Sequence, residues 1–221
     1  MVAYTVWVGA VFLAWLGGPF LAAGRAGWLE GWAYFAALAA ALVLHRRYVA
    51  GRNPELLRRR EKMGEGTRRW DIAWNVGFWP LMASVAIVAG FDERLGWMPM
   101  TGWLWLAGLL LLAGGFGLSA WAMAVNPHFE GTVRIQKERD HRVIDVGPYR
   151  RVRHPGYVGL ALWALGTPFL LLSWSAFVPA FSVVGWIALR TALEDRTLRD
   201  ELSGYRDYAS RVRFRLVPGL W

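Results

Sequence analysis

The stretch "GYVGLALWALGTPFLLLSWSAFVPAFSVVGWIAL", residues 156–189, contains no charged side chain over 34 positions. Because a transmembrane helix needs only about 20 apolar residues, this stretch is too long for a single span. Its "SWS" at 173–175, flanked by Pro168 and Pro179, predicts a turn near the middle. We therefore expect a hairpin of two short helices within a membrane protein of the all-α class.

The composition supports the membrane class. The chain has 221 residues, 56% of them hydrophobic, and no cysteine, which excludes a disulfide framework, a Cys-ligated zinc site and thiol catalysis. Further apolar stretches at 2–24, 31–44, 72–91 and 102–125 predict four more spans. We expect about six transmembrane helices, arranged as an N-terminal four-helix region (1–125) and a C-terminal core (126–221).

The basic residues predict the topology. If 156–189 is a hairpin, 23 of the 25 Lys and Arg residues fall on one side of the membrane, in the loops 45–70 and 126–155 and in the tail 190–221. The positive-inside rule then places both termini in the cytoplasm, and it explains the net charge of +9 without a nucleic-acid partner. Tryptophans near the predicted span ends are typical of an aromatic belt at the membrane surface: Trp28, Trp32, Trp70, Trp74, Trp97, Trp103 and Trp174.

Ionisable residues are missing from the middle of every predicted span, which disfavours an ion-coupled transporter. A functional site is therefore expected at the cytoplasmic ends of the spans, where the segments 126–159 and 190–221 flank the hairpin. Because a hairpin brings its two ends together, residues of the two segments should meet: Arg153, His154 and Tyr157 on one side, and Arg190, Glu194 and Asp195 on the other.

The first segment contains "GPYRRVRHPGYVG" (147–159), in which Pro155 suits the first position of a helix and His154 its cap. Free backbone N–H groups at such a helix start suit a carboxylate or a polar ligand edge. The alternative is a membrane-surface loop, in which Arg150, Arg151 and Arg153 bind phospholipids and the two tyrosines are interfacial.

In the second segment Arg190 and Glu194 are four residues apart on one helical face, with the arginine first. That order is the less favourable one for an ion pair, so we expect separate partners, a cationic amine for Glu194 and an anion for Arg190. The neighbouring charges are interpreted as a surface network, and "GYRDY" (204–208) as an interfacial amphipathic segment. The four histidines lack HxxxH or HExxH spacing, which argues against a metal site.

The sequence "GPYRRVRHPGYVGL", preceded by "RIQKERDHRVIDVG" and followed by "LEDRTLRDEL" and "GYRDY", resembles the isoprenylcysteine carboxyl methyltransferase family of integral-membrane enzymes. The resemblance covers about 126–221 and implies an S-adenosyl-L-methionine-dependent methyltransferase. It implies that Arg190 faces the substrate carboxylate and that Arg153 supports the loop or the cofactor's carboxylate. The implied cofactor-binding residues are Gln136, His141, Arg142, Val143, Ile144, Gly147, Tyr149, His154, Pro155, Gly156, Tyr157, Glu194 and Asp195.

The implied acceptor is lipophilic, enters from the bilayer and carries a carboxylate, although a lipid amine or a small thiol also fits the residues. A carboxylate is ionised at pH 7 and needs no general base, whereas an amine or thiol requires a proton acceptor. The composition and compact length suggest a bacterial plasma membrane. Two other classes stay open: a non-catalytic transporter subunit or scaffold, and a membrane reductase sharing the helical core.

Overall fold

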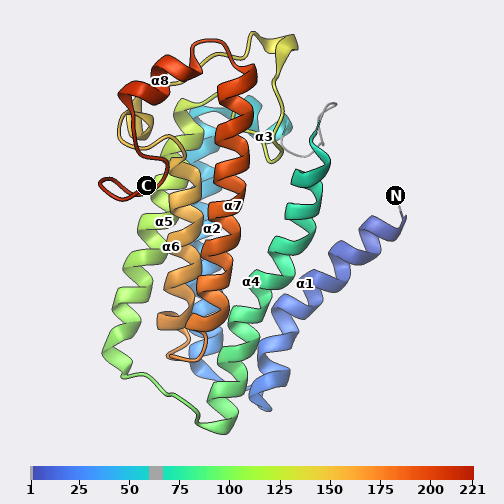
Figure 1. The fold of residues 1–221 in the computed structure, drawn as a ribbon. Coiled ribbons are helices and arrows are strands. Elements are labelled where there is room, and N and C mark those ends of the chain that lie inside the picture. The colour runs from blue at the N-terminus through green and yellow to red at the C-terminus, as the bar shows by residue number, and fades with distance from the viewer. Residues whose placement is uncertain (1, 60–66) are drawn as a thin grey trace. The chain divides into compact units, whose positions relative to one another are not determined.

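The computed structural model describes residues 2–59 and 67–221, and this part of the chain holds helices and loops but no strand (Figure 1). The all-α prediction is confirmed. The α-helices are α1 (Val2–Ala23), α2 (Leu29–Arg52), α3 (Pro54–Arg59), α4 (Arg69–Leu95), α5 (Trp105–Val125), α6 (Pro155–Leu170), α7 (Phe177–Glu201) and α8 (Tyr205–Arg211). Three short 3-10 helices are η1 (Gly102–Leu104), η2 (Lys137–Arg139) and η3 (Gly147–Arg150).

Three helical segments of the described chain are long and apolar enough to cross a membrane: α4, η1 together with α5, and α7. They include the predicted spans 72–91 and 102–125; α1 covers the predicted stretch 2–24 except its last residue, and α2 covers 31–44. The class of polytopic helical membrane protein is therefore confirmed. Six crossings and a cytoplasmic location of both termini stay predictions. Two of the basic residues used for that topology, Arg60 and Lys62, lie outside the described residues.

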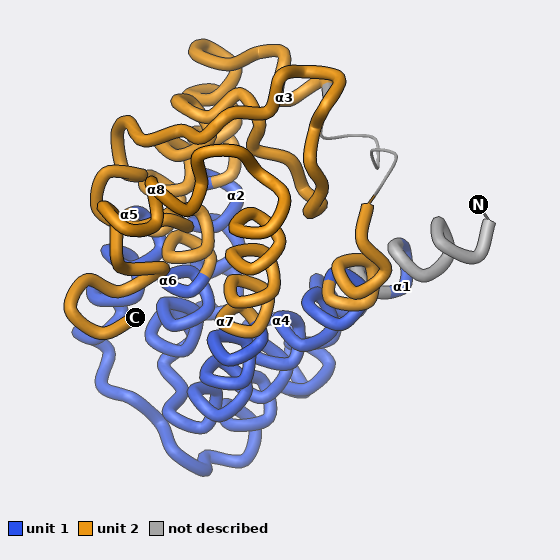
Figure 2. Tube along the Cα trace, turned by 45° about the horizontal axis from the view of Figure 1, so that its top comes forward, with its two compact units in different colours: residues 1–41, 75–113, 161–186 blue, residues 42–74, 114–160, 187–221 orange. Residues whose placement is uncertain are grey.

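The chain forms two compact units, each assembled from three segments (Figure 2). Unit 1 comprises residues 1–41, 75–113 and 161–186, and unit 2 comprises 42–74, 114–160 and 187–221. Every residue proposed for the functional site belongs to unit 2. The division of the chain at residue 125 stays a prediction.

In unit 1 the hairpin turn lies where the sequence predicts it, at residues 171–176 between α6 and α7. The turn is held by backbone hydrogen bonds from Met100 N–H to Leu172 O (2.9 Å) and from Trp174 N–H to Met98 O (3.1 Å). The expectation of two short helices is wrong for α7, which has 25 residues and continues to Glu201. The reason is local: residues 188–201 are rich in Ala, Leu, Glu and Arg, which favour helix even where they carry charge.

Asp92 fastens the loop after α4 to the hairpin turn within unit 1. Its side chain is buried, accepts a hydrogen bond from Met98 N–H (2.7 Å) and a second from the Ser173 hydroxyl. Ser173 Oγ in turn accepts a hydrogen bond from Ala176 N–H at 3.2 Å. The carboxylate thus satisfies donors from two loops that would otherwise be buried without a partner.

We expect Asp92→Ala to lower the free energy of unfolding by about 1–3 kcal/mol, because a buried donor left without an acceptor costs that much. Thermal unfolding in detergent, followed by circular dichroism, measures the change. The matched control is Glu93→Ala, since the neighbouring Glu93 pairs with Arg25 at the surface and such pairs contribute little. An equal shift for the two variants would contradict the anchoring role of Asp92.

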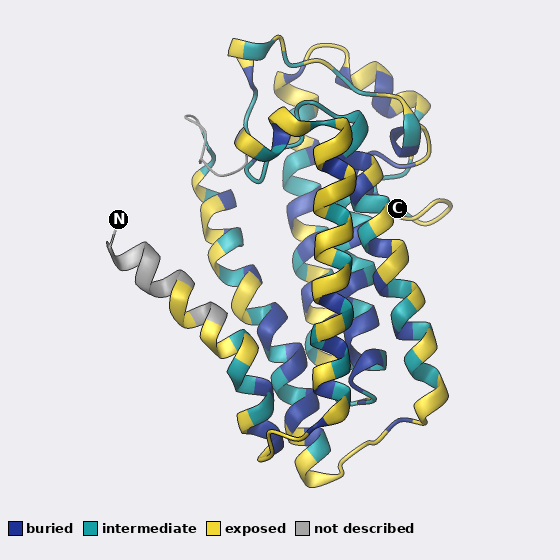
Figure 3. Cartoon of the chain, turned by 180° about the vertical axis from the view of Figure 1, so that it is seen from behind, coloured by how far each residue is buried: buried dark blue, intermediate teal, exposed yellow. Residues whose placement is uncertain are grey.

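Unit 2 contains a buried cluster formed by Ala122, Tyr149, Leu202, Tyr205, Tyr208 and Ala209. Within unit 2 the buried residues Ile187, Thr191 and Asp195 of α7 recur every four positions, so they share one face of the helix. Figure 3 shows buried and exposed positions alternating along the helices in this way. Close helix packing also uses glycine here: a Cβ on Gly159 of α6 would lie 2.4 Å from the Gly115 carbonyl oxygen of α5. This close approach packs the start of α6 against α5.

Candidate active site

The start of α6 is held in unit 2 by the tail that follows α8. The backbone N–H groups of Arg153 and His154 donate hydrogen bonds to the carbonyls of Phe214 and Arg215, each at 3.0 Å. Pro155 is the first residue of α6, and His154 O accepts the N–H of Tyr157 at 3.0 Å. The predicted helix start at Pro155 is confirmed, and two of its neighbouring N–H groups are already used by the protein.

Glu194 meets this helix start, as the hairpin argument predicts. The Tyr157 hydroxyl donates a hydrogen bond to Glu194 Oε2, and His154 Nδ1 lies 3.9 Å from Glu194 Oε1. The rings of His154 and Tyr157 are stacked, with centroids 5.8 Å apart. The Glu194 side chain is 23% exposed, whereas that of His154 is only 5% exposed. Glu194 is therefore a partly accessible carboxylate on a rigid aromatic support.

Asp195 is the centre of a buried network. Its fully buried carboxylate binds Arg153 Nε (2.7 Å), Arg199 Nε (3.0 Å) and Arg215 Nε (3.0 Å). It also accepts a hydrogen bond from the Tyr205 hydroxyl (3.0 Å) and lies 3.4 Å from His154 Nε2. With so many donors from the chain itself, Asp195 is better suited to organise the site than to contact a ligand.

The guanidinium of Arg153, like the carboxylate of Asp195, is bound by groups of the chain itself. Besides Asp195 it donates from Nη1 to the carbonyls of Val212 (2.7 Å) and Arg213 (2.8 Å), so its guanidinium ties α7 to the tail. Its side chain is 2% exposed. Of the two roles implied by the resemblance, this geometry favours support of the loop. Arg150 and Arg151, by contrast, are exposed, as phospholipid anchors would be.

Arg190 and Glu194 have separate partners, as their order in the sequence predicts. Arg190 Nη2 lies 2.8 Å from Asp71 Oδ1 and donates a hydrogen bond to Gly131 O at 2.8 Å. Its guanidinium carbon is 4.3 Å from the ring centre of Trp74 and 5.4 Å from that of Tyr157. Arg190 is thus buried beside the residues that hold Glu194.

The loop before η3 surrounds Gln136 and a pair of histidines. Gln136 is buried, donates from Nε2 to His128 O (2.8 Å) and accepts from Arg139 Nη1 (3.0 Å). The rings of His128 and His141 are stacked with centroids 4.6 Å apart. Burial lowers the pKa of His141 to about 4, and burial also lowers the pKa of His128. Both imidazoles are therefore neutral at pH 7 and present flat, uncharged surfaces.

The remaining predicted cofactor residues line the same part of unit 2. Val143 and Ile144 pack against the Tyr205 and Tyr208 cluster, while Arg142 is exposed. Tyr149 accepts a hydrogen bond from Asn126 Nδ2 (3.0 Å) at its hydroxyl.

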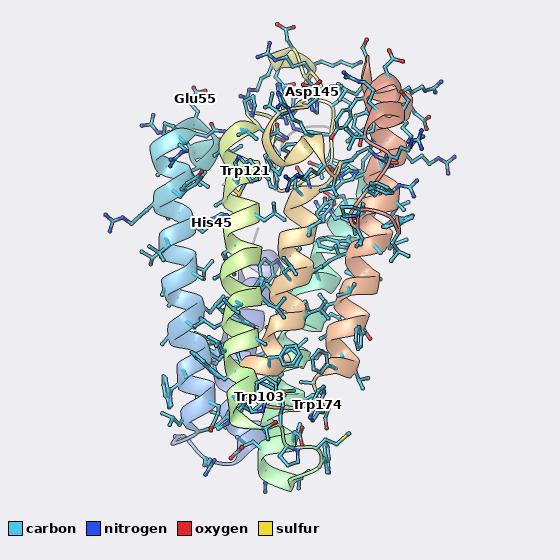
Figure 4. All side chains as sticks on the ribbon, turned by 90° about the vertical axis from the view of Figure 1, so that its left-hand side faces the viewer. His45, Glu55, Trp103, Trp121, Asp145 and Trp174 are labelled. Atoms are coloured by element: carbon cyan, nitrogen blue, oxygen red, sulfur yellow. The ribbon has the colours of Figure 1, made fainter. Side chains whose placement is uncertain are left out.

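Two glycines permit close approach near these residues. Gly147 has φ +59°, and a Cβ there would lie 3.1 Å from Trp121 Nε1, while a Cβ on Gly156 would lie 2.6 Å from the Phe129 ring. Figure 4 labels Trp121 on α5 and Asp145 in the loop before η3.

Sequence reasoning missed four residues of this site. The interfacial assignment of "GYRDY" is wrong, because Tyr205 and Tyr208 are buried and donate to Asp195 and to Tyr149 O, respectively. Trp74 is also buried against Arg190, unlike the exposed side chain expected of an aromatic belt, and Asp71 is not among the predicted site residues. The two tyrosines are three residues apart, which places them on one helical face, whereas nothing in the local sequence links Asp71 to Arg190.

Residues 107–200 match the sequence model of the isoprenylcysteine carboxyl methyltransferase (ICMT) family. That range includes the stacked His154 and Tyr157, Arg190, Glu194 and Asp195. The chain is ICMT-like over this region. The resemblance predicted from the sequence is therefore confirmed.

Curated relatives agree with this assignment. A probable protein-S-isoprenylcysteine O-methyltransferase of Oryza sativa subsp. indica is 38% identical over 87 residues, which are 38% of this chain and 45% of the relative. Protein-S-isoprenylcysteine O-methyltransferase B of Arabidopsis thaliana is 33% identical over 87 residues (38% and 44%), and the Saccharomyces cerevisiae enzyme is 36% identical over 87 residues (38% and 36%). The ICMT-like region thus spans less than half the length of each relative.

Proposed function

We propose that this chain is an integral-membrane methyltransferase that transfers a methyl group from S-adenosyl-L-methionine to a lipophilic acceptor. The observation that carries the proposal is the contact of Tyr157 and His154 with Glu194, which brings together the two ends of the hairpin within the ICMT-like region. The names of the relatives favour an isoprenylcysteine-type carboxylate as the acceptor, which makes the reaction an O-methylation.

The residues fit the methyl donor by their chemistry. Glu194 is a partly exposed carboxylate that suits the donor's ammonium group, and the neutral His128–His141 pair suits a flat heterocycle such as adenine. When bound, S-adenosyl-L-methionine supplies a methyl group on a positively charged sulfur. The support beneath these residues is rigid, since Asp195 and Arg153 fix the helix start that bears His154 and Tyr157.

Arg190 is the group proposed to recognise the acceptor. Its guanidinium carbon is 5.4 Å from the Tyr157 ring centre, and its Nε–H, which makes no hydrogen bond in the described part of the chain, can donate a charged hydrogen bond to a carboxylate. Because an acceptor carboxylate is already ionised at pH 7, the protein needs only to align it and remove its water. We place the site on the cytoplasmic side of a bacterial plasma membrane, with the acceptor's apolar tail entering from the bilayer.

Calorimetry of the detergent-purified protein with S-adenosylhomocysteine tests the proposal directly. We expect saturable binding, followed by methyl transfer to a prenylcysteine analogue in preference to phosphatidylethanolamine or a small thiol. Preference for the amine or the thiol would keep the methyltransferase and change its acceptor class. Folded protein that gives no heat at millimolar S-adenosylhomocysteine would overturn the proposal.

A further inference from the structure

Asp71, in the first turn of α4, is a fully buried carboxylate that lies outside the ICMT-like region. Its Oδ2 accepts a hydrogen bond from Val133 N–H at 2.8 Å, and its Oδ1 lies 2.8 Å from Arg190 Nη2. The side chain therefore connects the loop after α5 to α7. The hydrogen bond from Val133 N–H fixes the carboxylate in place, and the ion pair at Oδ1 holds the Arg190 guanidinium beside it.

In Arg190 the Nη2 group is bound by other residues of the chain, whereas the Nε–H group makes no hydrogen bond within the described residues. Nη2 is held by Asp71 and by the Gly131 carbonyl, and Trp74, three residues after Asp71 on the same helix, lies 4.3 Å from the guanidinium carbon. The Arg190 side chain is 7% exposed, and its Nε is buried without a hydrogen bond in the described part of the chain. Since a guanidinium has five N–H groups, this arrangement leaves donors for a ligand.

We propose that Asp71 is a positioning residue for acceptor recognition, which orients Arg190 so that its remaining N–H groups meet the acceptor's carboxylate. This inference rests on the proposed function and adds a residue that the family region does not contain. Asp71 also balances the charge of Arg190 while no acceptor is bound, which makes its burial tolerable. The binding of the acceptor's carboxylate then depends more on where the N–H groups of Arg190 point than on the net charge of the site.

A purely structural role of Asp71 predicts a different result from a positioning role. Loss of structure would weaken the binding of every acceptor to a similar extent. Loss of Arg190 orientation would weaken only acceptors that carry a carboxylate, because an uncharged carboxamide of the same size gains much less from a guanidinium. A pair of prenylcysteine analogues, one with a free carboxylate and one with a carboxamide, separates the two roles.

Asp71→Asn removes the negative charge and places an oxygen toward only one of the two partners, Val133 N–H or Arg190, while the amide NH2 faces the other. We expect the KM of the carboxylate analogue to rise about tenfold, the equivalent of losing one charged hydrogen bond. The inhibition constant of the carboxamide analogue and the affinity for S-adenosylhomocysteine should both stay within about twofold of wild type, well below that tenfold step. Steady-state kinetics and calorimetry provide the three values.

Asp92→Asn is the matched control, because Asp92 is a buried carboxylate on the same helix that belongs to unit 1, where it accepts hydrogen bonds from Met98 and Ser173. Asp92→Asn should lower the free energy of unfolding. It should leave unchanged the ratio between the KM of the carboxylate analogue and the inhibition constant of the carboxamide analogue. If Asp71→Asn fails to fold, Trp74→Leu removes the ring beside Arg190 and should raise the KM of the carboxylate analogue selectively.

An unchanged KM in Asp71→Asn, or equal weakening of both analogues, would overturn the positioning role. Failure of the proposed function has a different signature, namely wild type that neither binds S-adenosylhomocysteine nor methylates the analogue. In that case calorimetric binding of the two analogues to wild type and Asp71→Asn still decides the role of Asp71.

Discussion

Asp195→Ala is expected to destabilise unit 2 by about 3–5 kcal/mol, the usual cost of removing one partner from a buried ion pair. The substitution leaves the 2%-exposed Arg153 guanidinium without its carboxylate and deprives the Tyr205 hydroxyl and Arg215 of their acceptor. Thermal unfolding in detergent, with and without S-adenosylhomocysteine, measures the loss. We expect ligand binding to disappear as well, because Asp195 would no longer hold the side chains of Arg153, His154 and Arg215 together.

The control is Asp200→Ala on the same helix. Asp200 is 55% exposed and pairs with Arg196 and Arg206 at 3.9 and 3.6 Å, and such exposed pairs contribute little to stability. Its unfolding temperature and its ligand affinity should match those of wild type. The organising role of Asp195 is wrong if Asp195→Ala unfolds at the same temperature as Asp200→Ala.

The hairpin and the meeting of its ends were predictable from sequence because they depend on long-range regularities. An uncharged stretch of 34 residues is too long for one span, and a turn at Ser173 to Ser175 brings His154 and Glu194 together whatever the details of packing. The separate partners of Arg190 and Glu194 followed from their order on a helix. These inferences need only hydropathy, helix geometry and charge.

The partners of the buried charges were not predictable in the same way. Asp71 is 119 positions before Arg190, and a single acidic residue in a basic segment looks like a solvated charge. Tyr205 and Tyr208 follow a helix end and read as interfacial aromatics, yet their rings are buried in a hydrophobic cluster while their hydroxyl groups donate to Asp195 and to the Tyr149 carbonyl. Sequence patterns indicate which side of a helix is apolar, but they do not specify which distant residue completes a polar cluster.

Glu194→Gln is expected to reduce the affinity for S-adenosylhomocysteine by about 30-fold or more, since losing one charged partner in a partly buried hydrogen bond costs about 2 kcal/mol. The substitution removes the charge and keeps the shape. Tyr157 can still donate to the amide oxygen, so the unfolding temperature should change little. Calorimetric titration with S-adenosylhomocysteine and a parallel thermal scan measure the two effects.

The matched variant is Glu201→Gln, on the same helix, because Glu201 is 42% exposed and pairs with Arg68 at the surface. It should bind S-adenosylhomocysteine like wild type. Equal affinities of Glu194→Gln and wild type would remove the ammonium-binding role of Glu194. Asp71 is already bound by Arg190 and Val133, and Asp195 is already bound by its arginines. Neither carboxylate can therefore replace Glu194 as the partner of the ammonium group. The proposed binding mode, in which Glu194 holds the cofactor's ammonium group, would then fail.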